Sequence, residues 1–363
     1  MKRILVWGMG KCGTEFLSIS SSVPYIEIVG ITDSSFKPSK KTFGDYNVIE
    51  PASIGGINYD YIVVAVYSES VFQEIRNTII MILDDDTKIL KWDGFLSEER
   101  RSILRRKYSD SDDEEIKETL RFLENHSLTV RNNYSNTNRV KYRLNFDKKV
   151  GLPYVLYYGK RMYYPLRYAN YEFIENVEEN DQYAGSPHLY IPNQRHCVRN
   201  GDIVIDGGVC EGNFALKFID QLKKVYLIEP DEEWFDVLRV TFEPWEDKVK
   251  LVKKYLCDED GADQITIDRL VEGEPVDFVK MDIEGSECLA LLGGLDTIEK
   301  YHPQLSICTY HKQNDARNIG FIMRALGYTT SMSNGYMFFK CDKNIDYSMD
   351  FRRGVIYGDF VDE

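Results

Sequence analysis

The sequence predicts an α/β protein of two Rossmann-like domains joined by a small α+β segment. Three observations support this fold class. Short apolar runs alternate with helix-length segments, two of these runs end in glycine-rich loops, and the 363-residue chain is long enough for two or three domains. We place the domains at 1–108 and 186–363, with the connecting segment at 109–185, because the charge balance changes near both boundaries.

The first glycine-rich loop follows an apolar run at residues 4–7 and has the spacing G-x-G-x-x-G, with glycines at positions 8, 10 and 13. Glycines at this spacing allow a tight turn and let a pyrophosphate approach the N-terminus of the next helix. A second expected strand, residues 26–32, ends at Asp33, where a ribose-binding carboxylate would lie. The alternation continues with strands or helices at 61–66, 69–83, 88–92 and 97–107. The loop predicts either nucleotide binding or a Rossmann-like unit that serves packing or assembly.

The connecting segment contains a basic, tyrosine-rich stretch, although the whole chain has a net charge of −14. Residues 127–169 carry a net charge of +8 and eight tyrosines. A helix is expected over 112–125, and residues 155–164 predict a β-hairpin that turns at Gly159 and Lys160. Two interpretations stay open. The stretch binds an anionic acceptor such as a nucleotide-sugar, or its tyrosines pack on a sheet.

The second glycine-rich loop follows a strand expected at 201–206 and differs from a dinucleotide fingerprint. This strand ends in Asp206, and an acid here suits a cationic or amino-bearing ligand better than a pyrophosphate, which it would repel. The next strand ends in Glu229, where a carboxylate can accept hydrogen bonds from both ribose hydroxyls. Together these acids favour S-adenosylmethionine over NAD.

Charged side chains also follow two later strands of this domain. Lys280, Asp282 and Glu284 alternate along the end of one strand and therefore point to one side. The next strand, 304–310, leads directly to His311. Ligands bind at the carboxyl ends of the strands in open α/β sheets, so we expect these groups to border the ligand crevice.

Residues from about 180 to 340 resemble the FkbM family of S-adenosylmethionine-dependent methyltransferases. Four features match in order, namely IDGGVCEGNF (205–214), LIEPD (227–231), ITIDRL with KMDIEGSE (265–270 and 280–287), and ICTYHKQND (307–315). The lead-in GSPHLY (185–190) is similar to that of one branch of the family. The first domain resembles the N-terminal Rossmann-like domains attached to bacterial sugar-modifying enzymes.

The resemblance implies a class I methyltransferase fold for the second domain and methyl transfer to oxygen, commonly to a sugar hydroxyl. It implies that Glu229 holds the ribose, that Asp258 lies near the adenine, and that Asp282 lies where cofactor meets acceptor. Asp206, Gly208 and Gly212 would surround the methionine part. The expected cofactor-binding residues are Asp206, Gly208, Glu211, Gly212, Asn213, Glu229, Asp258 and Asp282.

Methyl transfer to an alcohol requires a group that removes the hydroxyl proton. His311 and His188 are candidate bases because histidine titrates near neutral pH, and each could instead be a structural histidine. Asp282 is a candidate base or acceptor anchor, and Glu284 belongs to the same catalytic group. Glu284 and Glu287 could join Asp282 as oxygen ligands of Mg²⁺, or they could orient the loop and begin a helix. No metal-ligand set is assigned.

Composition limits the other functions. The acidic balance argues against a generic nucleic-acid binder, and no apolar run reaches the roughly 18 residues of a membrane span. Seven cysteines without CxxC pairing fit reduced thiols in a cytoplasm. We therefore expect a cytoplasmic O-methyltransferase, monomeric or homo-oligomeric, acting on a nucleotide-sugar or glycan in bacterial surface-polysaccharide or natural-product biosynthesis. The alternatives are an NAD- or nucleotide-using sugar-modifying enzyme that acts through the first domain, and a non-catalytic scaffold.

Overall fold

A computed structural model describes the chain except residues 22, 40, 129, 131–141, 169–181, 184, 343 and 361–363. The chain forms two compact units. The first contains residues 1–109, 126–128 and 343–349, and the second contains residues 110–125, 129–342 and 350–363. The described residues of the expected connecting segment thus belong mostly to the second unit. No helix in the described part of the chain is long and apolar enough to cross a membrane.

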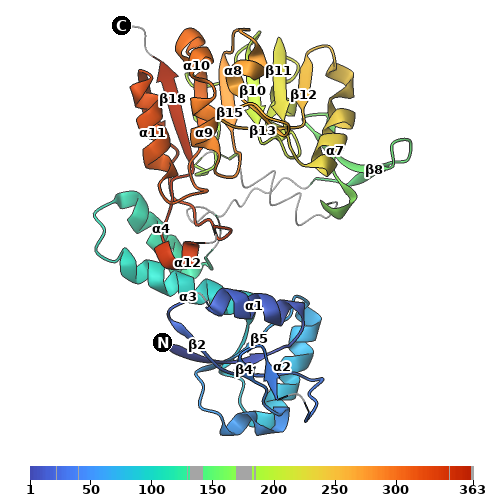
Figure 1. The fold of residues 1–363 in the computed structure, drawn as a ribbon, viewed down its shortest axis with the longest axis vertical. Coiled ribbons are helices and arrows are strands. Elements are labelled where there is room, and N and C mark those ends of the chain that lie inside the picture. The colour runs from blue at the N-terminus through green and yellow to red at the C-terminus, as the bar shows by residue number, and fades with distance from the viewer. Residues whose placement is uncertain are drawn as a thin grey trace. The chain divides into compact units, whose positions relative to one another are not determined.

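The first unit is built on a four-stranded parallel sheet with strand order β2-β1-β5-β6 (Figure 1). Its strands are β1 (Lys2–Trp7), β2 (Ile26–Thr32), β5 (Tyr61–Val64) and β6 (Ile89–Lys91), with a small ribbon of β3 (Thr42–Phe43) and β4 (Tyr46–Asn47). Its helices are α1 (Lys11–Ser21), α2 (Glu69–Leu83), α3 (Trp92–Lys107), the short α12 (Ile345–Ser348) and the 3₁₀ turn η1 (Pro51–Gly56). Alternate residues of β1 enter separate cores, because successive side chains of a strand point to opposite faces.

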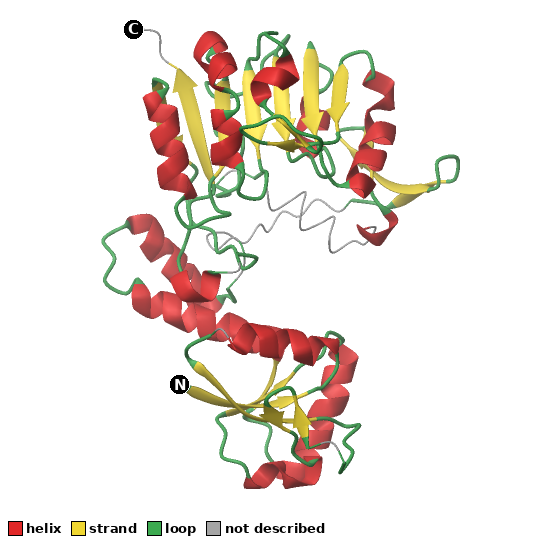
Figure 2. Ribbon diagram, viewed as in Figure 1, coloured by secondary structure: helices red, strands yellow, loops and turns green. Residues whose placement is uncertain are grey.

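The second unit holds a seven-stranded sheet (Figure 2). Its strand order is β12-β11-β10-β15-β16-β18-β17. Its strands are β10 (Ile203–Gly207), β11 (Lys224–Ile228), β12 (Val249–Val252), β15 (Phe278–Met281), β16 (Gln304–Cys308), β17 (Tyr328–Met332) and β18 (Val355–Phe360). Strand β18 runs antiparallel to both of its neighbours, and the other neighbouring strands of this sheet are parallel. The sequence predicted β10, β11, β12, β15 and β16, but neither β17 nor the antiparallel β18.

Helices cover this sheet and a short ribbon lies beside it. The helices are α6 (Asn213–Phe218), α7 (Glu232–Phe242), α8 (Ile267–Val271), α9 (Glu287–Leu292), α10 (Leu295–Tyr301) and α11 (Asp315–Ala325). The unit also contains α4 (Glu114–Asn125) and the 3₁₀ turns η2 (Leu166–Tyr168) and η3 (Glu243–Trp245). The ribbon is β13 (Tyr255–Leu256) with β14 (Gln264–Ile265). Val204 of β10 packs into one core, and Ile203 and Ile205 pack into the other. The sheet is therefore buried on both faces, which leaves its strand ends for ligands.

The tyrosine-rich stretch forms a three-stranded sheet of β7 (Asn145–Asp147), β8 (Leu152–Tyr157) and β9 (Lys160–Tyr163). The predicted hairpin is present, but Tyr157 pairs with Lys160, so the turn residues are Tyr158 and Gly159. Both have positive φ, at 48° and 78°, as a tight two-residue hairpin turn requires. The earlier placement of the turn at Gly159 and Lys160 was therefore wrong by one residue.

Three of the described basic residues of this stretch form ion pairs within the second unit. The ion pairs are Lys160–Asp220 at 2.8 Å, Arg161–Asp147 at 2.6 Å and Arg167–Glu233 at 2.6 Å. Tyr157, Tyr163 and Tyr164 are buried. For the described residues, these contacts favour the packing interpretation over an exposed anion-binding surface.

Candidate active site

A cavity of about 430 Å³ opens at the carboxyl ends of the central strands of the second unit. Loops after β10, β11, β15 and β16 contribute to its wall. Seven predicted site residues line it, namely His188, Gly208, Glu211, Asn213, Glu229, Asp282 and Glu284. This size lies within the range of small-molecule sites, and the location is the one expected for an open α/β sheet.

Four predicted site residues do not line this cavity. Asp206 is fully buried behind it, with Lys280 Nζ at 2.9 Å from Asp206 Oδ1. Gly212 packs where a Cβ would lie within 3 Å of the side chains of Leu238 and Phe242. Asp258 is exposed, and His311 is buried at the back of the site. Asp206, Gly212 and His311 can therefore support the site only from behind its wall.

The glycine loop needs the absence of a side chain at Gly208. A Cβ at this position would lie 1.8 Å from the carbonyl oxygen of Asp282, and the residue has a positive φ of 71°. Gly208 N–H donates to Ile228 O at 3.0 Å, and Asp282 N–H donates to Gly207 O at 3.0 Å. The loop is therefore pressed against the ends of both neighbouring strands, and the smallest residue is required there.

Two non-glycine residues beside the cavity also have left-handed backbone conformations. Cys210 has φ 51° and Glu284 has φ 56°. Such conformations cost about 1–3 kcal/mol and persist where the surrounding structure enforces them. Both residues lie in loops that line the cavity, so the wall of the site includes two strained backbone positions.

Two buried carboxyl groups lie at the β10–β11 end of the cavity. Glu229 accepts hydrogen bonds from the N–H groups of Cys210 and Asp231, each at 2.9 Å. Burial raises the pKa of Glu229, although these two hydrogen bonds lower it. Burial also raises the pKa of Glu211 to about 7. Burial makes both carboxyl groups costly to ionise. A ligand that brings hydroxyl donors and a positive charge would therefore stabilise their ionised forms.

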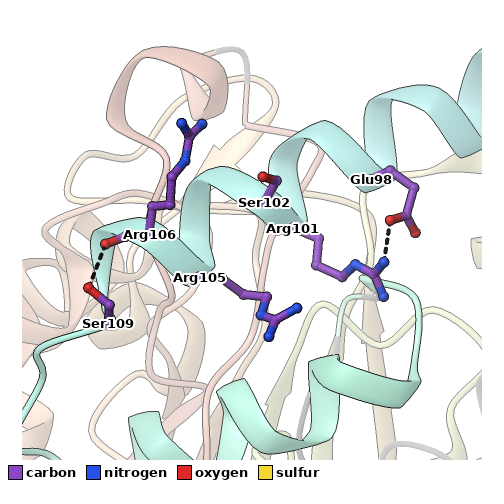
Figure 3. A pocket seen from close by; sticks show the side chains of 6 residues that line it. All are labelled: Glu98, Arg101, Ser102, Arg105, Arg106 and Ser109. Carbon is purple, nitrogen blue, oxygen red and sulfur yellow. Dashed lines mark hydrogen bonds and ion pairs between the residues drawn. The ribbon is translucent and has the colours of Figure 1, made fainter.

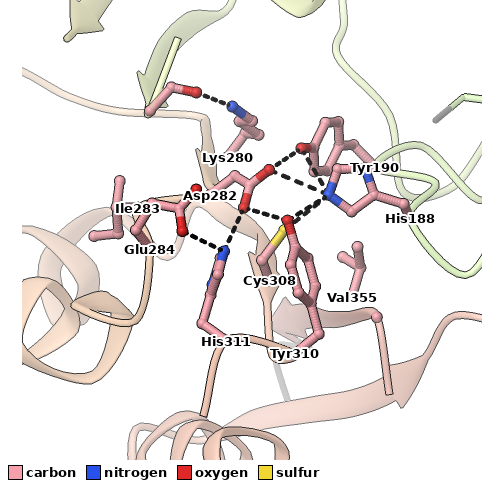
Figure 4. A network of polar contacts seen from close by, with 12 residues as sticks. His188, Tyr190, Lys280, Asp282, Ile283, Glu284, Cys308, Tyr310, His311 and Val355 are labelled. Carbon is pink, nitrogen blue, oxygen red and sulfur yellow. Dashed lines mark hydrogen bonds and ion pairs between the residues drawn. The ribbon is translucent and has the colours of Figure 1, made fainter. Parts of the chain in front are cut away.

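Asp282 receives four neighbours at the other end of the cavity (Figure 4). Its Oδ2 lies 3.1 Å from His188 Nε2 and accepts from the Tyr190 hydroxyl at 2.9 Å. Its Oδ1 accepts from the Tyr310 hydroxyl at 2.9 Å and lies 3.3 Å from His311 Nε2. Burial opposes ionisation, but His188 and His311 hold the pKa of Asp282 well below its usual range. Asp282 is therefore a carboxylate at neutral pH.

His311 lies between two acids. Its Nδ1 is 3.0 Å from Glu287 Oε1, and Glu287 also accepts from Ile283 N–H at 2.9 Å. Burial alone would lower the pKa of His311, but Asp282 and Glu287 together raise it to about 10. An imidazole with this pKa is protonated at neutral pH, so it suits an electrostatic anchor better than a base.

The three predicted Mg²⁺ ligands all lie within 4 Å of a ring nitrogen of His311. Both Asp282 oxygens have two donor neighbours each, and Glu287 is engaged by His311 and a backbone N–H. The Glu284 side chain is 83% exposed. Two side-chain groups could bring three ligand atoms together, His188–Asp282–Cys308 and Asp282–Glu287–His311, but their members already pair with one another. The three acids therefore do not fit the oxygen cage that Mg²⁺ prefers.

The structure adds lining residues that the sequence reasoning did not select. They are Tyr190, Trp234, Lys254, Tyr255, Ser286 and Tyr310, among others. Tyr190 and Tyr310 matter most because both hydroxyls donate to Asp282. Each lies beside a selected histidine in the sequence, within two residues of His188 and next to His311. Long-range packing of residues 92 positions apart brings Tyr190 to Asp282.

Among the described residues, the contacts of the first glycine loop involve one acid, Asp33. Asp33 Oδ2 accepts from Met9 N–H at 2.7 Å, and Asp33 Oδ1 accepts from Ser35 N–H at 2.8 Å. A Cβ on Gly13 would lie 2.1 Å from Gly8 O, so this glycine is needed for close packing of α1 against the loop. These contacts stabilise the conformation of the loop.

A cavity of about 570 Å³ in the first unit lies along α3, away from its glycine loop. Its lining contains Glu98, Arg101, Ser102, Arg105, Arg106 and Ser109 (Figure 3). Arg101 pairs with Glu98, and Ser109 donates to the carbonyl oxygen of Arg106. Most of this wall is a single helix face with exposed side chains, so it lacks the enclosure of the second-unit cavity.

Comparisons with known proteins agree with this division. Residues 257–330 match the family model of the FkbM methyltransferase domain, and residues 1–90 match that of the C2185-like N-terminal domain. A search of curated proteins found no match.

Three solved structures are similar to the chain. Methyltransferase FkbM from Methylobacillus flagellatus is 16% identical, with 98% of this chain and 90% of that chain covered and a TM-score of 0.46. Precorrin-6y C5,15-methyltransferase from Geobacter metallireducens is 9% identical, with 46% and 84% covered and a TM-score of 0.32. An rRNA methylase from Streptococcus thermophilus is 17% identical, with 45% and 90% covered and a TM-score of 0.31.

Proposed function

We propose that this chain, an S-adenosylmethionine-dependent methyltransferase with an FkbM domain behind a C2185-like N-terminal domain, methylates a hydroxyl group of a sugar. The acceptor is a nucleotide-sugar or glycan in bacterial surface-polysaccharide or natural-product biosynthesis. The observation that carries this proposal is one cavity with two chemically different ends. Glu229 and Glu211 lie at one end, and Asp282 with His188 lies at the other.

The first end fits the cofactor. Glu229 would accept the ribose hydroxyls, and Glu211 would face the positively charged methionine part. Gly208 lets the backbone approach the ligand where a side chain would not fit. When bound, S-adenosylmethionine supplies an electrophilic methyl group on a sulfonium centre.

The second end fits proton removal from an alcohol. Asp282 already accepts from both tyrosine hydroxyls and is a weak base, and His311 is held protonated. His188 is therefore the proposed general base. In the tautomer that fits its contact with Asp282, His188 Nε2–H donates to Asp282 Oδ2, and the other ring nitrogen takes the hydroxyl proton. Asp282, 3.1 Å away, stabilises the imidazolium that forms.

The test is a screen of acceptors with methyl-labelled S-adenosylmethionine. Nucleotide-sugars and free glycans are compared with catechols and amines at equal concentration. Label in the sugar part of a product, stable to amine-specific derivatisation, is the expected result. Transfer only to catechols or amines would overturn the sugar hydroxyl as acceptor.

A further inference from the structure

Arg352 contacts the backbone of two residues that join Asp282 from the loop after β16. Its side chain is 2% exposed. Arg352 Nη1 donates to the carbonyl oxygens of Tyr310 and His311, at 3.0 and 2.8 Å. The side chains of these two residues lie 2.9 and 3.3 Å from Asp282 Oδ1. One buried cation is thus linked to both groups that contact this oxygen.

Two carboxylates hold the same guanidinium from the other side. Arg352 Nη2 contacts Asp342 Oδ2 at 2.6 Å, and Nε contacts Asp350 Oδ1 at 3.3 Å. Residues 343–349 between these acids belong to the first compact unit. The chain therefore leaves the second unit after Asp342 and returns at Asp350, and Arg352 ties both points to the loop of Tyr310.

These contacts use the guanidinium in a way that lysine cannot reproduce. All three of its nitrogens have acceptors among two carboxylates and two carbonyl groups. A guanidinium is a planar fork with fixed donor directions, whereas an ammonium is a compact point charge. A buried charge also requires nearly complete pairing. The position of Arg352 is therefore fixed, and it fixes the carbonyl groups that it contacts.

We propose that Arg352 is a positioning residue for methyl transfer, which sets the Tyr310–His311 backbone so that both side chains reach Asp282. This inference rests on the proposed function of the Asp282 site. Arg352 is outside the residues that line the cavity, so it acts through its two neighbours and does not hold the cofactor.

The chain offers a matched control in the next residue. Arg353 pairs with Asp113 and Glu115 near the beginning of α4, and its guanidinium lies over the ring of Tyr336. Arg352→Lys and Arg353→Lys both keep the positive charge and remove the fork. Only the first changes donors to the carbonyl groups of the catalytic loop.

Two measurements on the full chain do not require the acceptor. Calorimetry gives the Kd of S-adenosylhomocysteine, and NMR of ¹³C-labelled histidine, assigned with His311→Gln, gives the titration midpoint of His311. We expect Arg352→Lys to leave the Kd within about threefold. We expect it to lower the His311 midpoint by about one pH unit or more, because the imidazole moves away from Asp282. Arg353→Lys should change neither.

A change in the net charge around His311 would not explain a lower titration midpoint in Arg352→Lys. The acids around the His311 ring are Asp282, Glu284, Glu287 and Asp315, and Arg352 is the buried cation behind its carbonyl group. Arg352→Lys leaves the formal charge of every one of these positions unchanged. With an acceptor in hand, turnover should fall about tenfold or more with an unchanged KM for the cofactor.

The results for the Arg352 variant and for the wild-type protein test different claims. An unchanged His311 midpoint in folded Arg352→Lys would overturn the positioning role. If this variant does not fold, Asp342→Asn loosens the same guanidinium, and we expect a smaller shift in the same direction. No shift there would overturn the role equally. Failure of the wild-type protein to bind S-adenosylhomocysteine would instead refute the proposed function.

Discussion

The two units of the chain share the same glycine-loop arrangement. In each, the loop follows a central parallel strand, and the neighbouring strand ends in an acid that accepts a loop N–H. Asp33 accepts from Met9 at 2.7 Å, and Glu229 accepts from Cys210 at 2.9 Å. At this level the two Rossmann-like units are equivalent.

The units differ in the strand on the other side of the loop. In the first unit, β5 continues into the apolar residues Ala65 and Val66. In the second unit, β15 contains Lys280 and continues to Asp282 with its tyrosine and histidine neighbours. A glycine loop therefore provides space and backbone donors, whereas the adjacent strand provides the chemistry. The following predictions test this difference.

The largest effect should come from Asp282→Asn. Loss of the charge that stabilises the His188 imidazolium should reduce turnover about 100- to 10,000-fold. The Kd of S-adenosylhomocysteine should change much less, because Glu229 and the glycine loop are untouched. Steady-state kinetics with the acceptor from the screen, together with calorimetry, measures both. Full turnover in this variant would show that Asp282, at the end of β15, takes no part in proton removal.

The two strand-end acids should differ in their effect on the cofactor. Glu229→Ala removes a charged acceptor of two ribose hydroxyls and should weaken S-adenosylhomocysteine binding about 100-fold. Asp33→Ala removes the equivalent acid of the first unit and should leave the affinity unchanged. Calorimetry on both variants gives the comparison. Equal losses would show that both units contribute to one cofactor site.

Alanine in either glycine loop should destabilise its own unit. In Gly208→Ala, the new Cβ meets Asp282 O at 1.8 Å, and in Gly13→Ala it meets Gly8 O at 2.1 Å. The positive φ of Gly208 adds about 1–3 kcal/mol to the steric cost. Urea unfolding should therefore show a loss of stability in both variants. Only Gly208→Ala should also weaken S-adenosylhomocysteine binding, and weakening in Gly13→Ala would contradict this separation.

The smallest effect concerns pH. The pKa of His311 is raised to about 10, above its value of about 6.5 in an unfolded chain. The folded state therefore binds the proton more tightly, and this stabilisation is complete below about pH 6.5 and lost as the pH rises towards 10. Urea unfolding of the second unit should become easier over this range. His311→Gln should flatten the slope, whereas His126→Gln should leave it unchanged.

Local patterns predicted most of the fold. The strand at 26–32 and the helix at 69–83 have the predicted bounds, because apolar periodicity, a glycine loop and a serine N-cap mark them. The prediction did not include β17, the antiparallel β18 or the passage of residues 343–349 into the first unit. All three depend on contacts between segments far apart in the chain, which leave no periodic signal.

The site was predictable where chemistry lies at a strand end. Glu229 and Asp282 line the cavity as expected, whereas Asp206 is turned to Lys280 and Asp258 does not line the cavity. Sequence spacing gives the position of a residue along a strand but not the partner that packs on it. The hydrogen bonds from the two tyrosine hydroxyls to Asp282 could therefore be found only from the structure.

The central claim is that the second glycine loop, and not the first, belongs to the cofactor site. Titration of S-adenosylhomocysteine and of NAD into the full chain by calorimetry tests it most directly. The account predicts one site per chain for S-adenosylhomocysteine with a Kd in the micromolar range, and no binding heat for NAD. Binding of NAD without binding of S-adenosylhomocysteine would contradict it.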